Sequence, residues 1–304
     1  MIANYVSYVV QAVLTALVLV PGIALLVLLL RKFGISKEPT RRWVNFTVAA
    51  FGFWCLCNLL FVIVGIMTVV PGPYTRYSLM QSYAMSVMNL IGGLLHHAGQ
   101  ASLFLALFYL ARTLTLLRTD ETSKRYRIGR LFALGTAGFI VVLALTAFCL
   151  NIAGYALHID QYRYGYPSSQ WARVEVMWLV AAIFGIVTTA FHAFCSIGAI
   201  VYVAKARNKV KNGPLHKASD LLLVCAILWL IRAAWMVVYI ITSMTGVLYS
   251  PWYYVFDWAT LVDFFLNTAI MFVVLVLLYV LATKSTYGLL KQQDQGKTLK
   301  EESV

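Results

Sequence analysis

The chain has 304 residues, of which 62% are hydrophobic and only 12% are charged, and its formal net charge is +13. A soluble domain carries about 45–50% apolar and about 25% charged residues, so this chain has too few polar side chains to cover a water-facing globule. The positive charge does not indicate nucleic-acid binding, because the Lys and Arg residues lie in short clusters between long apolar runs. The composition therefore indicates an integral membrane protein and excludes a soluble one.

Seven apolar stretches along the chain are long enough to cross a membrane. A spanning helix needs about 20 apolar residues, because each residue rises ~1.5 Å and the hydrocarbon core is ~30 Å thick. We predict an all-α membrane protein with one seven-helix domain over residues 1–283 and a mobile polar tail over 284–304. In chain order, the predicted spans are 6–30, 43–70, 82–110, 131–152, 174–203, 221–245 and 255–282.

The segments between these spans alternate in charge. The first, third and fifth are rich in Lys and Arg, as is the C-terminal tail, whereas the second holds only Arg76 and the sixth holds no basic residue. Basic loops stay in the cytoplasm during membrane insertion. We therefore expect the N-terminus outside and the C-terminus in the cytoplasm, in the plasma membrane or an endomembrane.

Several polar residues fall near the middle of predicted spans, where polar groups are costly and often mark function. Arg232 lies in the sixth span, His96 and Gln100 lie in the third, and Asp263 and Asn267 lie four residues apart in the seventh. This spacing places the last two on one helix face. We predict that these five side chains meet, with Arg232 and Asp263 forming an ion pair.

Two other interpretations of these polar residues remain open. Polar side chains also hold membrane helices together, by hydrogen bonds worth about 0.6–2 kcal/mol each, so the ion pair could be purely structural. A metal or haem site could use His96 or His97 together with His192. Because no ligand-spacing motif accompanies these histidines, we predict no metal site, no cofactor and no catalytic residue.

Two short segments carry a resemblance to a known family. Residues 231–239 read Ile-Arg-Ala-Ala-Trp-Met-Val-Val-Tyr, and residues 252–257 read Trp-Tyr-Tyr-Val-Phe-Asp. They resemble the sixth-helix segment and the entry to the seventh helix of the fungal RTA1-like family of lipid-translocating exporters. The resemblance implies seven helices in this orientation, a role in lipid movement, and functional roles for Arg232 and Asp257. The chain departs from the family at Met236 and Tyr239, where the family usually has a second Arg and a Glu.

We therefore expect a non-enzymatic protein that binds, translocates or senses a lipid or other amphiphile, with membrane lipids and one small amphiphilic ligand as partners. The five polar side chains predicted to meet would line the polar part of its cavity, and Trp235, Tyr239 and Phe256 would line the apolar part. The expected ligand-binding residues are Arg232, Asp263, Asn267, His96, Gln100, Trp235, Tyr239, Phe256 and Asp257.

Two alternative functions follow from other features of the sequence. The topology resembles that of G-protein-coupled receptors, and in such a protein the basic loops and Arg112 would contact a cytoplasmic signalling partner. The receptor motifs Asp-Arg-Tyr and Asn-Pro-x-x-Tyr are absent from the chain. The second alternative is a membrane-embedded enzyme acting on a lipid or prenyl substrate, with Asp263 and either Asp257 or Glu175 as paired acids.

Overall fold

The computed structural model describes residues 2–33, 41–69, 76–119, 124–164, 168–210, 214–244 and 261–284. Within these ranges, seven helices are long and apolar enough to cross a membrane, which confirms the predicted all-α, seven-helix membrane protein. The last of them, Leu261–Thr283, contains a π-helical segment. In chain order, the elements are α1 (Ile2–Phe33), α2 (Arg42–Val69), α3 (Arg76–Thr119), α4 (Lys124–Tyr164), α5 (Ser168–Lys209), α6 (Pro214–Met244), η3 (Phe264–Ala269) and α8 (Ile270–Thr283).

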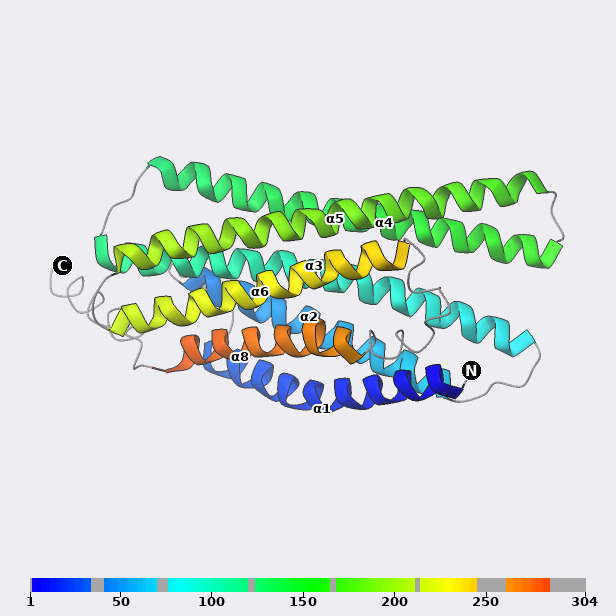
Figure 1. Cartoon of the computed structure of the whole chain (residues 1–304), viewed down its shortest axis with the longest axis horizontal. Coiled ribbons are helices and arrows are strands. Elements are labelled where there is room, and N and C mark those ends of the chain that lie inside the picture. Colours follow the sequence, from blue (N-terminus) through cyan, green and yellow to red (C-terminus); the bar gives the residue numbers. More distant parts are fainter. Residues whose placement is uncertain are drawn as a thin grey trace.

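Helices α3, α4 and α5 extend well past their predicted spans. They have 44, 41 and 42 residues, which corresponds to lengths of about 60–66 Å, or twice the hydrocarbon thickness. A helix satisfies its backbone hydrogen bonds internally, so it can continue through polar residues beyond the apolar run. Figure 1 shows α4 and α5 projecting beyond α6 and the last helix.

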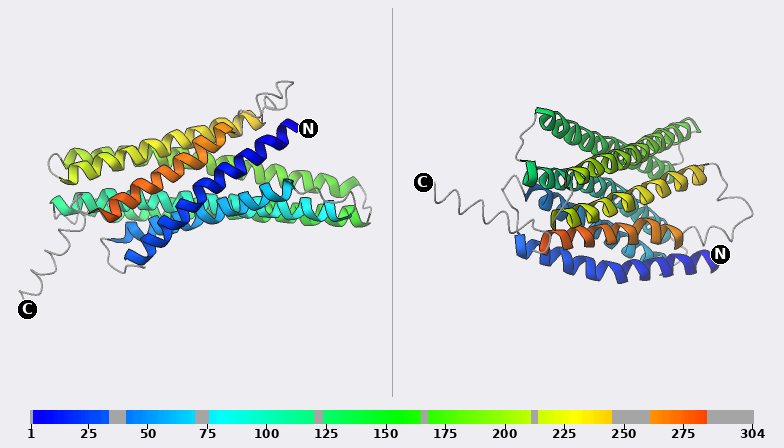
Figure 2. Two further views of the ribbon diagram at one scale, coloured as in Figure 1. Left: turned by 90° about the horizontal axis from the view of Figure 1, so that it is seen from below. Right: turned by 60° about the vertical axis from the view of Figure 1, so that its left-hand side comes forward.

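Helix α3 forms the centre of the bundle. In its most apolar window 67% of the residues are buried, against 22–33% in the other six helices. Helices α4 and α5 pack along one side of α3, and α2 packs along another (Figure 1). Helix α1 lies on the outside of the bundle, against α2 and α8 (Figures 1 and 2). The central position of α3 brings its polar residues within reach of several other helices.

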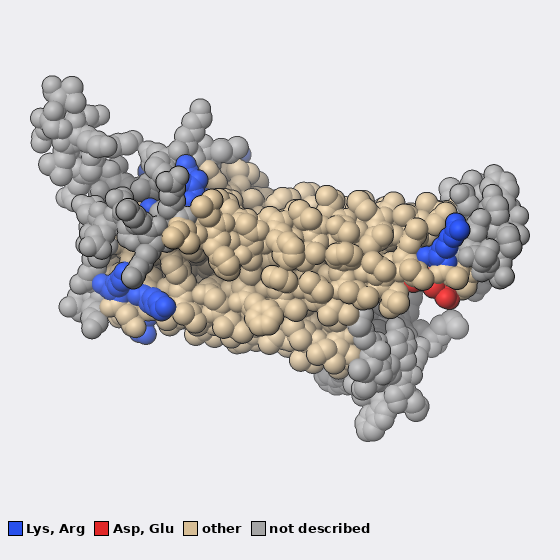
Figure 3. Space-filling view, turned by 90° about the horizontal axis from the view of Figure 1, so that it is seen from above, with Lys and Arg blue, Asp and Glu red and all other residues tan. Residues whose placement is uncertain are grey.

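On the face shown in Figure 3, the charged residues at the surface lie at the two ends of the bundle, with an uncharged band between them. We call the end at which α1, α3, α5 and α8 finish the basic end, and the other the opposite end. At the basic end, Lys32 Nζ donates to the Thr283 carbonyl at 2.9 Å, and Arg207 Nε lies 2.6 Å from Asp220 Oδ1. The chain therefore enters α1 and leaves α8 at different ends, as an odd number of spans requires.

Helices α1 and α2 approach closely at a glycine. A Cβ atom built on Gly22 would lie 2.5 Å from Trp54 Cζ3, so the indole ring occupies the place of a side chain. The ring is buried and stacks on Phe272 of α8, with ring centroids 5.7 Å apart. Pro21, next to this contact, removes one helical N–H and favours the bend of α1 around its neighbours.

This contact predicts that Gly22→Ala destabilises the bundle. The added methyl group would overlap a rigid, buried ring, and overpacking of this kind costs about 1–3 kcal/mol. The matched control is Gly52→Ala in α2, where an added Cβ would have nothing within 4 Å. Thermal unfolding in detergent should give a lower Tm for Gly22→Ala and no lower Tm for Gly52→Ala. Equal Tm values for the two variants would contradict the close approach.

Candidate functional site

A buried arginine lies at the centre of the bundle. Arg232 of α6 is 3% exposed and donates three hydrogen bonds to neighbouring helices. Its Nε donates to the Asn267 carbonyl at 2.9 Å, and its Nη2 donates to Asn267 Oδ1 at 2.5 Å and to His96 Nε2 at 2.9 Å. An arginine can only donate, so His96 Nε2 acts as the acceptor and the ring carries its proton on Nδ1. This arginine thus joins α3, α6 and the last helix.

The π-helical segment supplies one of these acceptors. Over η3 the hydrogen-bond register widens by one residue, so that the Ile270 N–H donates to the Phe265 carbonyl, five residues back. Such a change of register releases a backbone carbonyl from the regular α-helical pattern. The Asn267 carbonyl lies in this segment and accepts from Arg232 Nε. Asn267 thus presents both a side-chain and a backbone oxygen to the guanidinium from within the π turn.

The predicted direct ion pair between Arg232 and Asp263 is wrong. Asp263 Oδ1 instead accepts from Trp235 Nε1 at 3.0 Å, and among the described residues these two charged groups form no ion pair. Both line a polar cavity of about 100 Å³, across which they attract each other electrostatically. Asn267, and not Asp263, bonds Arg232 directly, because it lies one helical turn nearer the depth of Arg232 in the bundle.

The polar cavity is enclosed by amide and indole groups from four helices. Gln100 of α3 is buried, accepts from Trp229 Nε1 at 2.6 Å and approaches Met271 Sδ at 3.8 Å, which connects α3 to α6 and α8. The side chains with polar groups that line the cavity are Gln11, Trp54, Cys57, Asn58, His96, Gln100, Arg232, Asp263, Asn267 and Thr268. The five side chains predicted to meet therefore do line one cavity, and Asn58 lies among them.

A pair of histidines connects α3 to α5 beside the arginine. His97 Nδ1 lies 3.2 Å from His192 Nε2, and the two rings are nearly parallel, with centroids 5.4 Å apart. The His96 ring stands almost perpendicular to that of His97, at 5.7 Å. Within the described ranges, no group of three His, Cys, Asp or Glu residues could hold a metal ion.

A larger cavity of about 400 Å³ extends from this cluster toward the opposite end, between α2, α3, α5 and α6; we call it the main cavity. His96, His97 and Asn267 form one polar face of it. Asn89 and Thr189 also line it. Most of the remaining wall is apolar, and the larger apolar side chains are Leu60, Phe61, Met88, Ile186, Met236 and Ile240.

Three glycines create much of the volume of the main cavity. Gly92 and Gly93 of α3 and Gly185 of α5 line it, and a Cβ atom at any of them would have nothing within 4 Å. These glycines are not among the predicted site residues. The adjacent pair in the middle of a predicted helix was a usable signal, since each Gly costs about 1 kcal/mol relative to Ala there.

The remaining predicted site residues that the structure describes lie apart from the two cavities. Trp235 contacts Asp263 through its indole N–H, and the ring of Tyr239 lies 6.3 Å from that of Trp235, but neither lines the main or the polar cavity. Arg112 lies nearer the basic end, about 24 Å along α3 from His96. Phe256 and Asp257 lie outside the described residues, as do residues 285–304 of the predicted tail.

Comparison of the chain with protein-family models, with curated proteins and with solved structures finds no match. Inferences about function therefore depend on the geometry of the chain itself.

The hydrogen bonds predict which residues are energetically coupled to Arg232. In double-mutant cycles, Arg232→Met and Asn267→Leu should be coupled by about 1–2 kcal/mol, because the charged donor loses its direct acceptor. Trp235→Phe and Asp263→Leu should show a smaller coupling, of about 0.6–1.7 kcal/mol. Unfolding free energies in mixed micelles would provide both values. A coupling of Arg232 to Asp263 that exceeds its coupling to Asn267 would instead indicate a direct ion pair between Arg232 and Asp263.

Proposed function

We propose that this chain is a non-enzymatic membrane protein that binds a lipid or other amphiphile in the main cavity and either moves it or senses it. The observation that supports the proposal is the contrast between the polar face, formed by His96, His97 and Asn267, and the mostly apolar remainder of the lining, in which Asn89, Thr189 and the thiol of Cys57 are the other polar groups. A purely apolar ligand would leave the polar face unsatisfied, and a purely polar one would be desolvated against the walls.

Arg232 has an indirect role in this proposal. It lines the polar cavity and not the main cavity, and it bonds His96 and Asn267 from behind. Because His96 Nε2 accepts from Arg232, the only N–H that this ring can offer is at Nδ1. The ligand would therefore present an oxygen acceptor, such as a hydroxyl, carbonyl or phosphate oxygen. Arg232 is a positioning residue that orients the polar face.

The size of the cavity limits what can bind. A volume of about 400 Å³ is at the small end of the ~300–1,000 Å³ usual for ligand pockets. It would accommodate a headgroup and the beginning of a chain, and the rest of a long lipid would extend outside. The resemblance of residues 231–239 and 252–257 to RTA1-like lipid exporters supports the same class of ligand.

Filling the main cavity should abolish binding. Gly185→Leu places a side chain in the open space beside the polar face without changing Arg232, so a bound amphiphile should be weakened by about tenfold or more. Gly138→Leu is the matched control, because Gly138 also faces open space but lines neither cavity. Native mass spectrometry of the protein extracted gently from its membrane should detect a lipid or sphingoid base with the wild type and the control, but not with Gly185→Leu.

Other outcomes would select a different function. Equal ligand occupancy in Gly185→Leu and the control would contradict binding in the main cavity. Chemical turnover of a lipid or prenyl substrate by the reconstituted protein would favour the enzyme. Ligand affinity that changes when a guanine nucleotide and a G protein are added would favour the receptor. Transfer of a fluorescent phospholipid between the leaflets of proteoliposomes, blocked by Gly185→Leu, would identify transport rather than sensing.

A further inference from the structure

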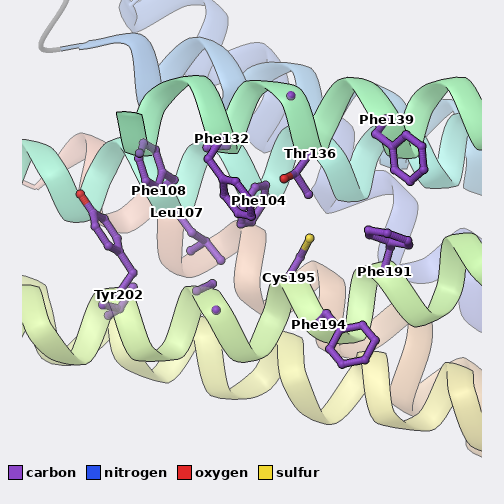
Figure 4. Close-up of a pocket in the computed structure, with 16 residues that line it drawn as sticks. Phe104, Leu107, Phe108, Phe132, Thr136, Phe139, Phe191, Phe194, Cys195 and Tyr202 are labelled. Atoms are coloured by element: carbon purple, nitrogen blue, oxygen red, sulfur yellow. The ribbon is translucent and has the colours of Figure 1, made fainter. Parts of the chain in front are cut away.

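A second, larger hollow lies on the other side of α3, in the half of the bundle near the basic end. It has a volume of about 590 Å³ and lies between α3, α4 and α5. Figure 4 shows side chains from these three helices around it. We call it the phenylalanine groove, after the six rings that line it, Phe104, Phe108, Phe132, Phe139, Phe191 and Phe194.

The groove exists because α4 and α5 lack side chains where they would otherwise fill the space between them. Gly135 of α4 and Gly198 of α5 line it, and a Cβ atom on either would have nothing within 4 Å. Phe132 and Phe194 are 73% and 71% exposed, so the groove is open at the side of the bundle. In a membrane, this side faces acyl chains.

The length of the groove matches one leaflet. From Phe191 to Val203 along α5 it extends for about 18 Å, compared with ~15 Å for half of a hydrocarbon core. Its walls are almost entirely apolar, and the polar groups among its lining side chains belong to Thr136, Cys195 and Tyr202. The groove is therefore suited to an extended hydrocarbon chain and not to a compact polar ligand.

Arginines from three helices gather at the basic end of this groove. Arg130 follows Gly129, which lines the groove, and Arg112 interacts electrostatically with Arg130, Arg42 and the groove residue Tyr202. Guanidinium groups bind phosphate through paired N–H donors and are attracted to anionic lipid headgroups. An apolar groove of one-leaflet length with clustered arginines at its headgroup end is complementary to an anionic phospholipid.

We propose that the phenylalanine groove binds one anionic phospholipid from the leaflet at the basic end, with an acyl chain between α4 and α5 and the phosphate beside Arg112 and Arg130. The site is separate from the main cavity, since it lies in the other half of the bundle and shares no lining residue with it. Lipid binding in the groove is therefore independent of ligand binding in the main cavity.

Native mass spectrometry from nanodiscs of defined composition tests this proposal. Wild-type protein in phosphatidylcholine discs containing phosphatidylserine should retain one phosphatidylserine at collision energies that remove phosphatidylcholine. Gly135→Leu should reduce this retention by about tenfold or more, because leucine fills the space for the chain. Gly198→Leu, on the facing helix, should do the same, and it provides a second test if Gly135→Leu does not fold. Gly138→Leu, on α4 but outside the groove, should retain the lipid like the wild type.

The headgroup contact has its own variant and control. Arg130→Gln should reduce the preference for phosphatidylserine over phosphatidylcholine, whereas Arg31→Gln removes the same charge from α1 and should leave the preference unchanged. Equal retention of the two lipids by the wild type would overturn the proposal. So would retention in both groove-filling variants that matches the control. A lipid-free dimer that disappears in Gly135→Leu would also overturn it, because the groove would then be a contact between two copies of the chain.

Discussion

A guanidinium at the middle of an apolar helix must find acceptors for its N–H groups within the protein, because lipid offers none. In this bundle, that requirement organises the centre. Arg232 takes two oxygens from Asn267 and one ring nitrogen from His96, so three helices are held at fixed heights relative to one another. One of the oxygens is a backbone carbonyl within the π-helical segment, so the arginine contacts the last helix where its hydrogen-bond register changes.

The residues that bond Arg232 also form the wall between the main cavity and the polar cavity. Cys57, Phe61, His96 and Asn267 line both the main cavity and the polar cavity. A ligand that competed for the Asn267 side chain or turned the His96 ring would remove acceptors from Arg232 and open a passage between the cavities. Under the proposed function, ligand binding would therefore be coupled to the position of the last helix through Arg232, and this coupling would offer a physical route from binding to either transport or signalling.

The sequence predicted the spans and the meeting of Arg232, His96, Gln100 and Asn267, because hydropathy sets the depth of each residue and depth decides which residues can meet. It did not predict the partner of the arginine. Choosing Asp263 over Asn267 gave opposite charge more weight than depth, although Asn267 lies one turn nearer the level of Arg232. The composition of residues 264–269 also does not indicate a π turn. The glycines illustrate a related limit. Gly22 faces an indole ring and Gly185 faces open space, a difference that depends on neighbouring helices and is absent from the local sequence.

The bond between His97 and His192 joins residues that lie beside the main cavity and the phenylalanine groove. His97 lines the main cavity, while Phe191, adjacent to His192 on α5, lines the groove. The bond holds α3 to α5 at this level, so neither hollow can widen there by separating these two helices. While this contact holds, α4 is the wall of the groove that can shift without breaking it, and α2, α6 and the last helix are the walls of the main cavity that can do so. The two hollows can therefore change independently, even though α3 and α5 contribute walls to both.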